Sequence, residues 1–473
     1  MEAGGFYYNP APSKAQRRQL EAQLLALAEE KAEKQQAKRA KASQAGHVGV
    51  EYIERTVSID SAQSGNSGAS GIHRRNNSYG GIGMATLQSS RSSSSSQSDA
   101  GHQYLLSHPY ELRHGRRFLR ELPYPLPVDL PEIQRQNLRT LLSNQVFGRP
   151  VCSPSVAQKV PKKVLEIGCG GAYWSALCHD HFLRLGYPDV AFVGLDVAPL
   201  APNFNLQGMN WKFVQHDVRR LPLPFDDEEF GLIMLKDLSL VLPSGPPFQK
   251  FLDETIRLLQ PGGTLEIWES DHIVRSLAQR PPPPSSKQLF EGRIAEHTAT
   301  FLVPPGTQFV PAQNKYMRQA NTWITDALDA RKLPPTPCVR IAQLLYQEPD
   351  FLGDVGTRRV AIPLSELRWE REAFKHARSN SDMVDSPMRQ KARSRERPLR
   401  PDQAAIRQTA LLTVLQNIES MEPMLKEASG KNSEEWSYWW ASMMTDLLDP
   451  AKGALNGECL EVGAWWATKL APS

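Results

Sequence analysis

The sequence predicts an α/β fold in which helices cover both faces of a mostly parallel sheet. Five short apolar segments containing β-branched residues alternate along the chain with stretches of helical patterning. Strands that are apolar almost throughout are typical of parallel sheets buried on both faces. Glycine or charged residues follow four of these segments, and ligands of such sheets bind beyond the carboxyl ends of the strands. The predicted strands are 163–167, 191–195, 211–215, 230–235 and 264–269.

Helical patterning with defined ends separates these strands. Residues 173–186 form a predicted helix that stops at the glycine and proline following it. Residues 247–260 are amphipathic and stop at a Pro-Gly-Gly turn. Further helices are predicted at 404–426 and 433–448, and a buried strand at 458–470, so we expect the C-terminal part to belong to the same fold.

Composition limits the classes of function. A chain of 473 residues with 40% hydrophobic and 22% charged residues can bury a sizeable core. The formal net charge of +4 is too small to indicate nucleic-acid binding. Five scattered cysteines without a CxxC pair predict neither a zinc site nor a disulfide framework, and they fit a reducing compartment. No secretory signal or membrane-spanning apolar run is recognisable, so we expect an intracellular protein, cytoplasmic or nuclear.

Two polar regions lie outside this pattern. Residues 1–102 are predicted to be largely disordered, because the serine-rich stretch in them has few bulky apolar residues to offset the entropy of ordering. Within them, strong helix formers at 14–43 predict one helix, and protein partners are expected to bind through this region. Residues 375–403 include a strongly basic stretch, which predicts a disordered loop or a nuclear-localisation patch. The globular part is therefore 103–473.

The segment VLEIGCGGAYW at 164–174 joins the first strand to a helix through small residues. Residues 168–171, Gly-Cys-Gly-Gly, would let a ligand approach the backbone and the free N–H groups of the helix N-terminus. Glu166 precedes them. A carboxylate there is a poor neighbour for a pyrophosphate, since like charges repel in a partly buried site, and it suits a ligand with an ammonium group.

Two acids follow the next two strands. Asp196 could accept hydrogen bonds from both hydroxyls of a ribose, and Asp217 could accept one from an exocyclic amine. Ribose, an amine-bearing base and an ammonium group together describe S-adenosylmethionine. The alternative is a dinucleotide site, but Tyr173 replaces its third fingerprint glycine, and Tyr173 with Trp174 would obstruct a pyrophosphate. A further alternative is that the glycines only form a tight turn between strand and helix. That interpretation would leave the positions of Asp196 and Asp217 unexplained.

These phrases resemble a known family. The order LEIGCGGAYW, GLDVAPLAP, NWKFVQHDV, FGLIMLKDL and LLQPGGTLEIWE is similar to that of class I S-adenosylmethionine-dependent methyltransferases over about 165–269. The segment YELRHGRRFLRELPYPLP at 110–127 and the Asp-x-x-Pro-x-x-Pro phrase at 196–202 resemble fungal LaeA-like methyltransferases. Ala172 stands where many members carry a third glycine, and we expect this small residue to be tolerated.

The resemblance implies the domain organisation. It implies a Rossmann-like sheet of seven strands with its core at 160–270. An antiparallel hairpin would end the sheet, with strands at 358–364 and 460–470, which makes 365–459 an insertion. Residues 280–350 are expected to fold over the cofactor as a cap that faces the substrate.

The resemblance also implies site residues. Asp196 would hold the ribose, and Asp217 with the Val218 N–H would hold the adenine. Lys236 and Asp237 follow the fourth strand, where the family faces the methyl group and the acceptor. The expected cofactor-binding residues are Glu166, Gly168, Cys169, Gly170, Gly171, Asp196, Val197, Asp217, Val218 and Lys236.

Methyl transfer mainly requires alignment of the acceptor with an activated methyl group, so sequence identifies catalytic residues poorly. The candidates are Lys236, Asp237 and His216. No histidine spacing predicts a metal site. The sequence LKDLSLVLP after the fourth strand lacks an Asn/Asp-Pro-Pro-aromatic loop, so a nucleobase amine in nucleic acid is not an expected acceptor. Cys338 is expected to pack rather than to act as a nucleophile.

Within 280–350, Tyr316, Met317, Trp323 and Ile324 could line a pocket. Their helical spacing is explained more simply by the buried face of one helix, which is the interpretation we favour.

The sequence therefore predicts an S-adenosylmethionine-dependent methyltransferase whose acceptor, a small molecule or a protein, is unidentified. The alternative from another class is an S-adenosylmethionine-binding regulatory protein that acts through complexes and has little catalytic activity. The long low-complexity segments and the absence of a recognisable acceptor motif keep that alternative open. A nicotinamide oxidoreductase is the third candidate.

Overall fold

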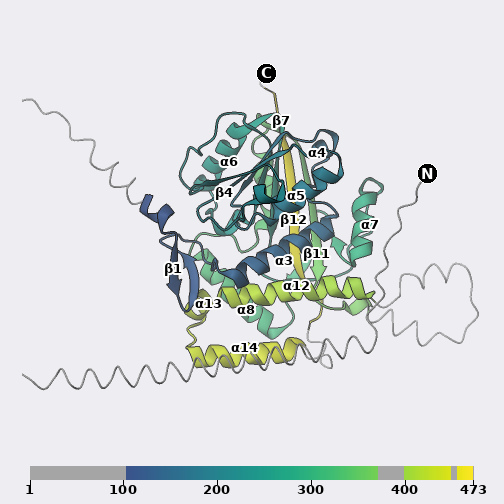
Figure 1. Ribbon diagram of the computed structural model, residues 1–473. Coiled ribbons are helices and arrows are strands. Elements are labelled where there is room, and N and C mark those ends of the chain that lie inside the picture. Colours follow the sequence, from purple (N-terminus) through teal and green to yellow (C-terminus); the bar gives the residue numbers. More distant parts are fainter. Residues whose placement is uncertain (1–102, 371–398, 449–454, 472–473) are drawn as a thin grey trace, which may run out of the picture. The chain divides into compact units, whose positions relative to one another are not determined.

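The structure, a computed structural model, describes residues 103–370, 399–448 and 455–471 (Figure 1). The predicted helix at 14–43, the predicted disorder of 1–102 and most of the predicted basic loop at 375–403 lie outside these residues. At the end of that loop the structure differs from the prediction, because helix α12 (Pro401–Ser420) already begins at Pro401.

A ten-stranded sheet organises the described residues. Its central strands are β3 (Lys163–Ile167), β4 (Ala191–Asp196), β5 (Trp211–Gln215), β6 (Phe230–Lys236), β7 (Leu259–Ser270), β11 (Leu352–Pro363) and β12 (Glu458–Lys469). The pairs β3–β4, β4–β5, β3–β6 and β6–β7 are parallel. Strand β12 is antiparallel to both β7 and β11. The order β5-β4-β3-β6-β7-β12-β11 confirms the predicted mostly parallel sheet of seven strands.

Shorter strands extend this sheet or lie apart from it. Strand β8 pairs with β12 and β10, and β9 pairs with β11. Strands β1 and β2 form a separate two-stranded sheet. The bounds are β1 (Tyr110–Arg113), β2 (Arg116–Leu119), β8 (Arg275–Leu277), β9 (Phe301–Leu302) and β10 (Phe309–Pro311).

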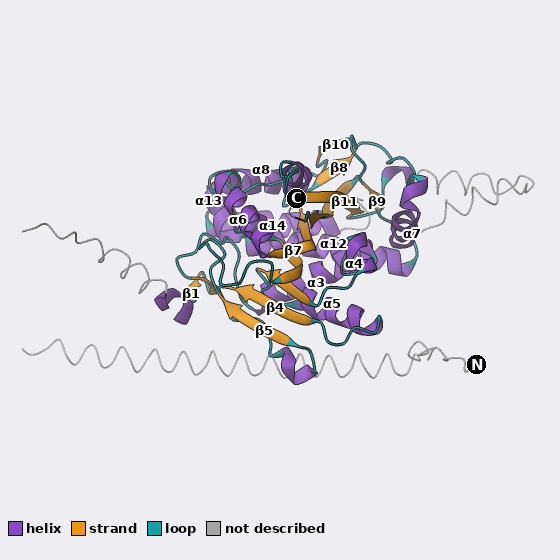
Figure 2. Cartoon of the chain, turned by 90° about the horizontal axis from the view of Figure 1, so that it is seen from above, coloured by secondary structure: helices purple, strands orange, loops and turns teal. Residues whose placement is uncertain are grey.

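Successive side chains of the parallel strands enter two separate cores, which explains why these strands are apolar throughout. Val164 belongs to one core together with Trp174 of α5 (Tyr173–Arg184). Its neighbour Leu165 belongs to the other core together with Phe251 of α6 (Pro246–Leu258). Figure 2 shows helices on both sides of the strands, as predicted.

Each helix predicted within the described residues is present, but one of them is divided in two. The segment predicted as helical at 404–426 forms two helices, α12 and α13, which meet at Met421. Pro423 lies in the first turn of α13, and its missing N–H cannot continue the hydrogen bonding of α12. The other helices are α3 (Leu130–Phe147), α4 (Pro154–Gln158), α7 (Leu289–Thr298), α8 (Lys315–Asp329), α9 (Ile341–Tyr346), α13 (Glu422–Ser429) and α14 (Ser433–Leu448).

Helix α3 was not predicted, although its ends carry clear signals. Asp129 caps its N-terminus by accepting a hydrogen bond from the Glu132 N–H at 3.3 Å, and Pro131 occupies the first turn. Gly148, with φ +75°, ends the helix. Helices α3 and α12 lie side by side (Figures 1 and 2).

Helix α8 shows the buried face that its spacing predicts. Met317 and Ile324 are buried together with Ala320 and Leu328. Trp323 of the same helix packs against Trp439 of α14, with ring centroids 4.8 Å apart. Among the described helices, none is both long and apolar enough to cross a membrane.

Candidate functional site

A cavity of about 120 Å³ lies beyond the carboxyl ends of the parallel strands. The loops after β3, β4, β5 and β6 form one side of it, and α3 with the segment before it forms the other. All of the site residues expected from the sequence line this one cavity. They are Glu166, Gly168, Cys169, Gly170, Gly171, Asp196, Val197, His216, Asp217, Val218, Lys236 and Asp237.

The glycine loop depends on backbone conformations that side chains disfavour. Gly168 has φ +68°, and a Cβ atom there would lie 2.5 Å from Leu238 Cδ2. Ala172, which caps α5, has φ +51° although it is not glycine, and it is fully buried. The expected tolerance of alanine at this position therefore comes with backbone strain.

Glu166, near the end of β3, is almost fully buried and accepts two hydrogen bonds from Ser175 of α5. Its Oε2 lies 3.2 Å from the Ser175 backbone N and 2.6 Å from Oγ. Burial raises the pKa of Glu166 to about 7, against the opposite effect of Ser175 and Lys236. The carboxyl group therefore changes charge near neutral pH, and its expected pairing with an ammonium group stays a prediction.

Asp196, the last residue of β4, connects two loops. Its Oδ2 accepts a hydrogen bond from the Gly170 N–H at 2.8 Å, and its Oδ1 accepts one from the Ala198 N–H at 3.1 Å. Burial raises the pKa of Asp196, while these backbone hydrogen bonds lower it. Each carboxylate oxygen has a further lone pair for a ligand hydroxyl.

Asp217 is held by a neighbour that sequence reasoning missed. Arg219 Nε and Nη2 lie 3.0 Å and 2.7 Å from the two carboxylate oxygens. The Arg219 backbone N–H also donates to Asp217 Oδ1 at 3.0 Å. This ion pair could have been expected from the sequence, because an acidic and a basic residue lie two positions apart on a predicted loop. His216 lies half-buried beside them, with Nε2 2.8 Å from the Arg220 carbonyl oxygen.

Asp237, directly after β6, is paired with two cations. Its Oδ1 lies 2.6 Å from Arg139 Nη2, and its Oδ2 lies 2.6 Å from Lys236 Nζ. Although burial opposes ionisation, Arg139 and Lys236 hold the pKa of Asp237 well below its usual value. Arg139 also contacts the Ser270 hydroxyl at the end of β7. Lys236 and Asp237 are thus joined in one charged group with α3.

A second polar group adjoins it and consists of Ser239, Glu269 near the end of β7, and His272. Ser239 donates its N–H and its hydroxyl to Glu269, at 2.8 and 2.7 Å, and Ser239 Oγ lies 3.0 Å from His272 Nε2. Since the serine proton is used by Glu269, the His272 Nε2–H donates to Ser239, and Nδ1 keeps its lone pair. This buried Nδ1 makes no hydrogen bond within the described residues.

Burial has opposite effects on the two titratable members of this group. It raises the pKa of Glu269 to about 7, and nearby Asp237 adds to that effect. Burial, helped by the charge of Arg139, lowers the pKa of His272 to about 3. His272 is therefore a neutral hydrogen-bond acceptor in the cavity wall at neutral pH. Its position directly beyond a predicted strand was the signal that could have identified it.

The far wall comes from a segment that the sequence analysis did not place at the site. Tyr124, Arg135, Gln136 and Arg139 line the cavity. No described residue of 280–350, the segment expected to cover the cofactor, lines it. The capping and proline signals at the start of α3 predict a helix, but they do not predict what that helix faces.

A smaller cavity of about 20 Å³ adjoins the first and shares Arg139 and His272 with it. Met317 and Ile324 of α8 line this smaller cavity. The buried face of α8 thus reaches the surroundings of the site without lining the main cavity.

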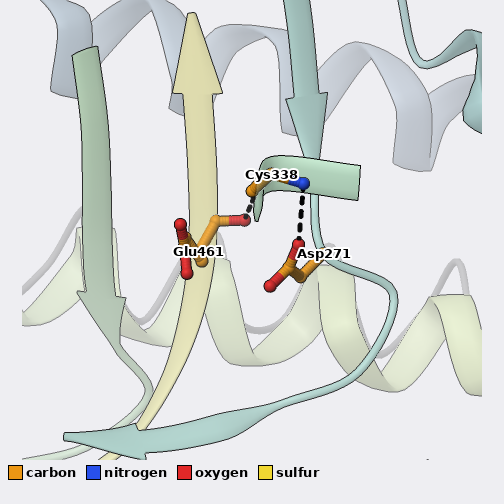
Figure 3. A group of neighbouring side chains, drawn as sticks. All are labelled: Asp271, Cys338 and Glu461. Atoms are coloured by element: carbon orange, nitrogen blue, oxygen red, sulfur yellow. Dashed lines mark hydrogen bonds between the residues drawn. The ribbon is translucent and has the colours of Figure 1, made fainter. Parts of the chain in front are cut away.

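One group of described side chains has the spacing of a metal site. Asp271, Cys338 and Glu461 bring ligand atoms within 4.8 Å of one another (Figure 3). Arg275 Nη2 lies 2.6 Å from Asp271 and 2.5 Å from Glu461, and Arg359 also pairs with Glu461. Burial raises the pKa of the Cys338 thiol well above its usual value. These arginines already balance the carboxylates, and the protonated thiol fits the expected packing role of Cys338.

Residues 164–263, from β3 into β7, match the model of a family described as a methyltransferase domain. These residues are similar to a methyltransferase domain. The matched residues contain the glycine loop, Asp196 at the end of β4, Asp217 after β5, and the Lys236–Asp237 pair.

Curated relatives match over similar stretches. Phthiotriol/phenolphthiotriol dimycocerosates methyltransferase of Mycobacterium tuberculosis is 26% identical over 178 residues, which cover 32% of this chain and 62% of the relative. Fatty-acid O-methyltransferase of Mycolicibacterium smegmatis is 33% identical over 107 residues, which cover 22% of this chain and 35% of the relative. The chain thus spans less than two thirds of either relative.

Solved structures resemble the chain more distantly. The YcgJ protein of Bacillus subtilis is 11% identical, with a TM-score of 0.31 over 71% of this chain and 99% of that protein.

Proposed function

We propose that the protein transfers a methyl group from S-adenosylmethionine to an acceptor. This proposal rests on one observation, which concerns where the expected site residues lie. Residues selected from the sequence for an ammonium group, a ribose and an adenine line one cavity at the strand ends of a methyltransferase domain.

The residues present fit this cofactor. At Gly170 and Gly171 the nearest atoms outside the loop lie 3.6 Å from where a Cβ atom would stand, so the backbone there is open to close approach by a ligand. Asp196 would accept from the ribose hydroxyls, Asp217 from the adenine amine, and Glu166 from the ammonium group. When bound, the cofactor supplies a sulfonium methyl group that is already activated for displacement.

The chain's own residues would then orient the acceptor and exclude water. Arg139 and Lys236 fix Asp237 at the end of β6, and His272 offers an uncharged hydrogen-bond acceptor beside them. A neutral imidazole can hold a protic acceptor group by its hydrogen. Alignment of this kind accounts for much of the rate in a simple displacement.

The acceptor class guides the choice of assay. The names of two relatives refer to a fatty acid and to phthiotriols. Lipid-like molecules with hydroxyl or carboxyl groups are therefore the first acceptors to assay, before protein fractions. The two phrases at 110–127 and 196–202 support a LaeA-like methyltransferase within the class I family.

The test combines binding with turnover. Calorimetry with S-adenosylmethionine and with a nicotinamide dinucleotide identifies the ligand, and formation of S-adenosylhomocysteine is then measured with and without cell extract. We expect S-adenosylmethionine to bind and the extract to stimulate product formation. Binding without extract-dependent turnover would support the regulatory alternative, and binding of the dinucleotide alone would refute both.

We also propose an intracellular location and protein partners that bind through 1–102. All five cysteines are buried and free, which suits a reducing compartment. Microscopy of the tagged full chain, and of a chain that begins at 103, tests location and the contribution of the N-terminal region.

A further inference from the structure

The guanidinium of Arg135 is buried in the wall of the main cavity. Arg135 is 3% exposed and lines the cavity from α3. Its Nε and Nη2 lie 2.8 and 2.6 Å from the two carboxylate oxygens of Glu132. Its third nitrogen, Nη1, is buried and makes no hydrogen bond within the described residues. A buried charged donor without an acceptor is costly, and structures rarely retain one without a reason.

The orientation of this guanidinium is fixed from behind. Glu132 is fully buried and also accepts hydrogen bonds from Ser420 Oγ of α12 at 2.7 Å and from Gln136 Nε2 at 3.0 Å. Both carboxylate oxygens are thus used in holding Arg135. A donor held in this way is preorganised, since little side-chain entropy remains to be lost when a ligand binds.

The other cations of the cavity wall have acceptors. Arg139 and Lys236 share Asp237, and Arg219 pairs with Asp217. Arg135 lies close enough to Asp237, at the end of β6, for the two charges to influence each other. The Arg135 guanidinium is therefore on the side of the cavity near the end of β6, where we place the amino-acid group of the proposed cofactor.

We propose that Arg135 Nη1 donates a hydrogen bond to the carboxylate of the amino-acid group of S-adenosylmethionine. This inference rests on the proposed function. Arginine prefers carboxylates because its donors match their geometry and the bond is charge-assisted. Glu166, which precedes the glycine loop, would accept from the ammonium group. The cavity would then offer an acceptor to the positive charge of the zwitterion and a donor to its negative charge. The site is then selective for adenosyl sulfonium ligands that retain the carboxylate.

The test compares two ligands on each of three proteins. The ligands are S-adenosylmethionine and decarboxylated S-adenosylmethionine, which lacks only the carboxylate, and their affinities are measured by calorimetry. The proteins are the full chain, Arg135→Lys, and Arg116→Lys as a matched control. Arg116 forms a similar fork, with Asp129, at 2.8 and 2.7 Å, and it does not line the cavity. Lysine keeps the charge beside Glu132, so the variant retains the buried ion pair.

We expect the full chain to bind S-adenosylmethionine at least tenfold more tightly than the decarboxylated ligand, which is typical of one charge-assisted hydrogen bond. In Arg135→Lys this ratio should fall to nearly one, because only the carboxylate ligand loses affinity. Arg116→Lys should keep the original ratio. An unchanged ratio in Arg135→Lys, or no preference in the full chain, overturns the inference while leaving the proposed function intact. Failure of the full chain to bind either ligand overturns both.

The ratio of the two affinities is insensitive to partial unfolding, since a smaller folded fraction lowers the apparent affinity for both ligands equally. A second variant pair, Glu132→Met with Arg135→Met, removes both buried charges and should lose the same ratio. Retention of the ratio in that pair would also overturn the inference.

Discussion

Asp196 Oδ2 accepts a hydrogen bond from the Gly170 N–H at 2.8 Å, which ties the end of β4 to the glycine loop after β3. The same carboxylate therefore shapes the loop and, under the proposed function, would also accept from the ribose. Removing it affects both functions.

Asp196→Ala should weaken S-adenosylmethionine binding by roughly tenfold to a hundredfold, because hydrogen bonds to a charged group contribute about 1.5–3 kcal/mol. Calorimetry measures the loss. Asp189→Ala, at an exposed residue just before β4, is the control and should bind normally. Unchanged affinity in Asp196→Ala would show that the ribose lies elsewhere.

The affinity for S-adenosylmethionine should depend on the charge of Glu166. Burial raises the pKa of this carboxyl group to about 7, so it is ionised above pH 7 and protonated below. An ammonium group favours the ionised form. Affinity should therefore be about tenfold weaker at pH 6 than at pH 8. Calorimetry across this range should find a flatter profile for Glu166→Gln, and the same slope in both proteins would contradict the pairing.

Ala172→Gly should leave stability within about 1 kcal/mol of the natural chain. Relief of the φ +51° strain offsets the lost methyl group and the greater freedom of the unfolded chain. Ala176→Gly, four residues on in α5, is the matched control and should destabilise by about 1 kcal/mol through helix propensity alone. Denaturant unfolding measures both, and equal losses would argue against strain at Ala172.

His272 should make the fold sensitive to acid. Burial and Arg139 lower its pKa to about 3, so the unfolded chain takes up a proton below pH 6.5 that the folded chain does not. Its contribution disfavours the folded state progressively from pH 6.5 down to about 3. Between pH 7 and pH 5 this costs about 2 kcal/mol.

His272→Gln should remove that loss, since the amide can still donate to Ser239 but does not titrate. The measurement is the free energy of unfolding at several pH values, with the difference between the two proteins as the readout. A difference that stays constant from pH 7 to pH 5 would show that His272 titrates normally in the folded chain.

The strands could be predicted because each is specified locally. Residues 163–167 and 211–215 are strands with the predicted bounds, and side chains such as Val164 and Leu165 alternate between cores on the two faces. The polar residues that follow such strands converge because parallel strands end at one edge. That is why Asp196 and Asp217 could be assigned to one site.

The rest depends on contacts between distant residues. Arg139 meets Asp237 across 98 positions of sequence, and nothing in the local pattern of α3 indicates that its arginines face the strand ends. For the same reason the sequence did not indicate that α3 and the segment before it, rather than 280–350, line the main cavity. The break between α12 and α13 at Met421 could have been predicted from Pro423. It was missed because helical patterning continues on both sides of it.

The hydroxyl of Ser420 braces Glu132 from a position 288 residues further along the chain. One wall of the main cavity is thus supported by residues that lie before and after 164–263 in the sequence. A shortened protein that ends before α12 would keep every residue of the glycine loop and of the acids after β4 and β5. It would nonetheless lose the support behind Arg135, so a shortened chain that keeps this wall must include both α3 and α12.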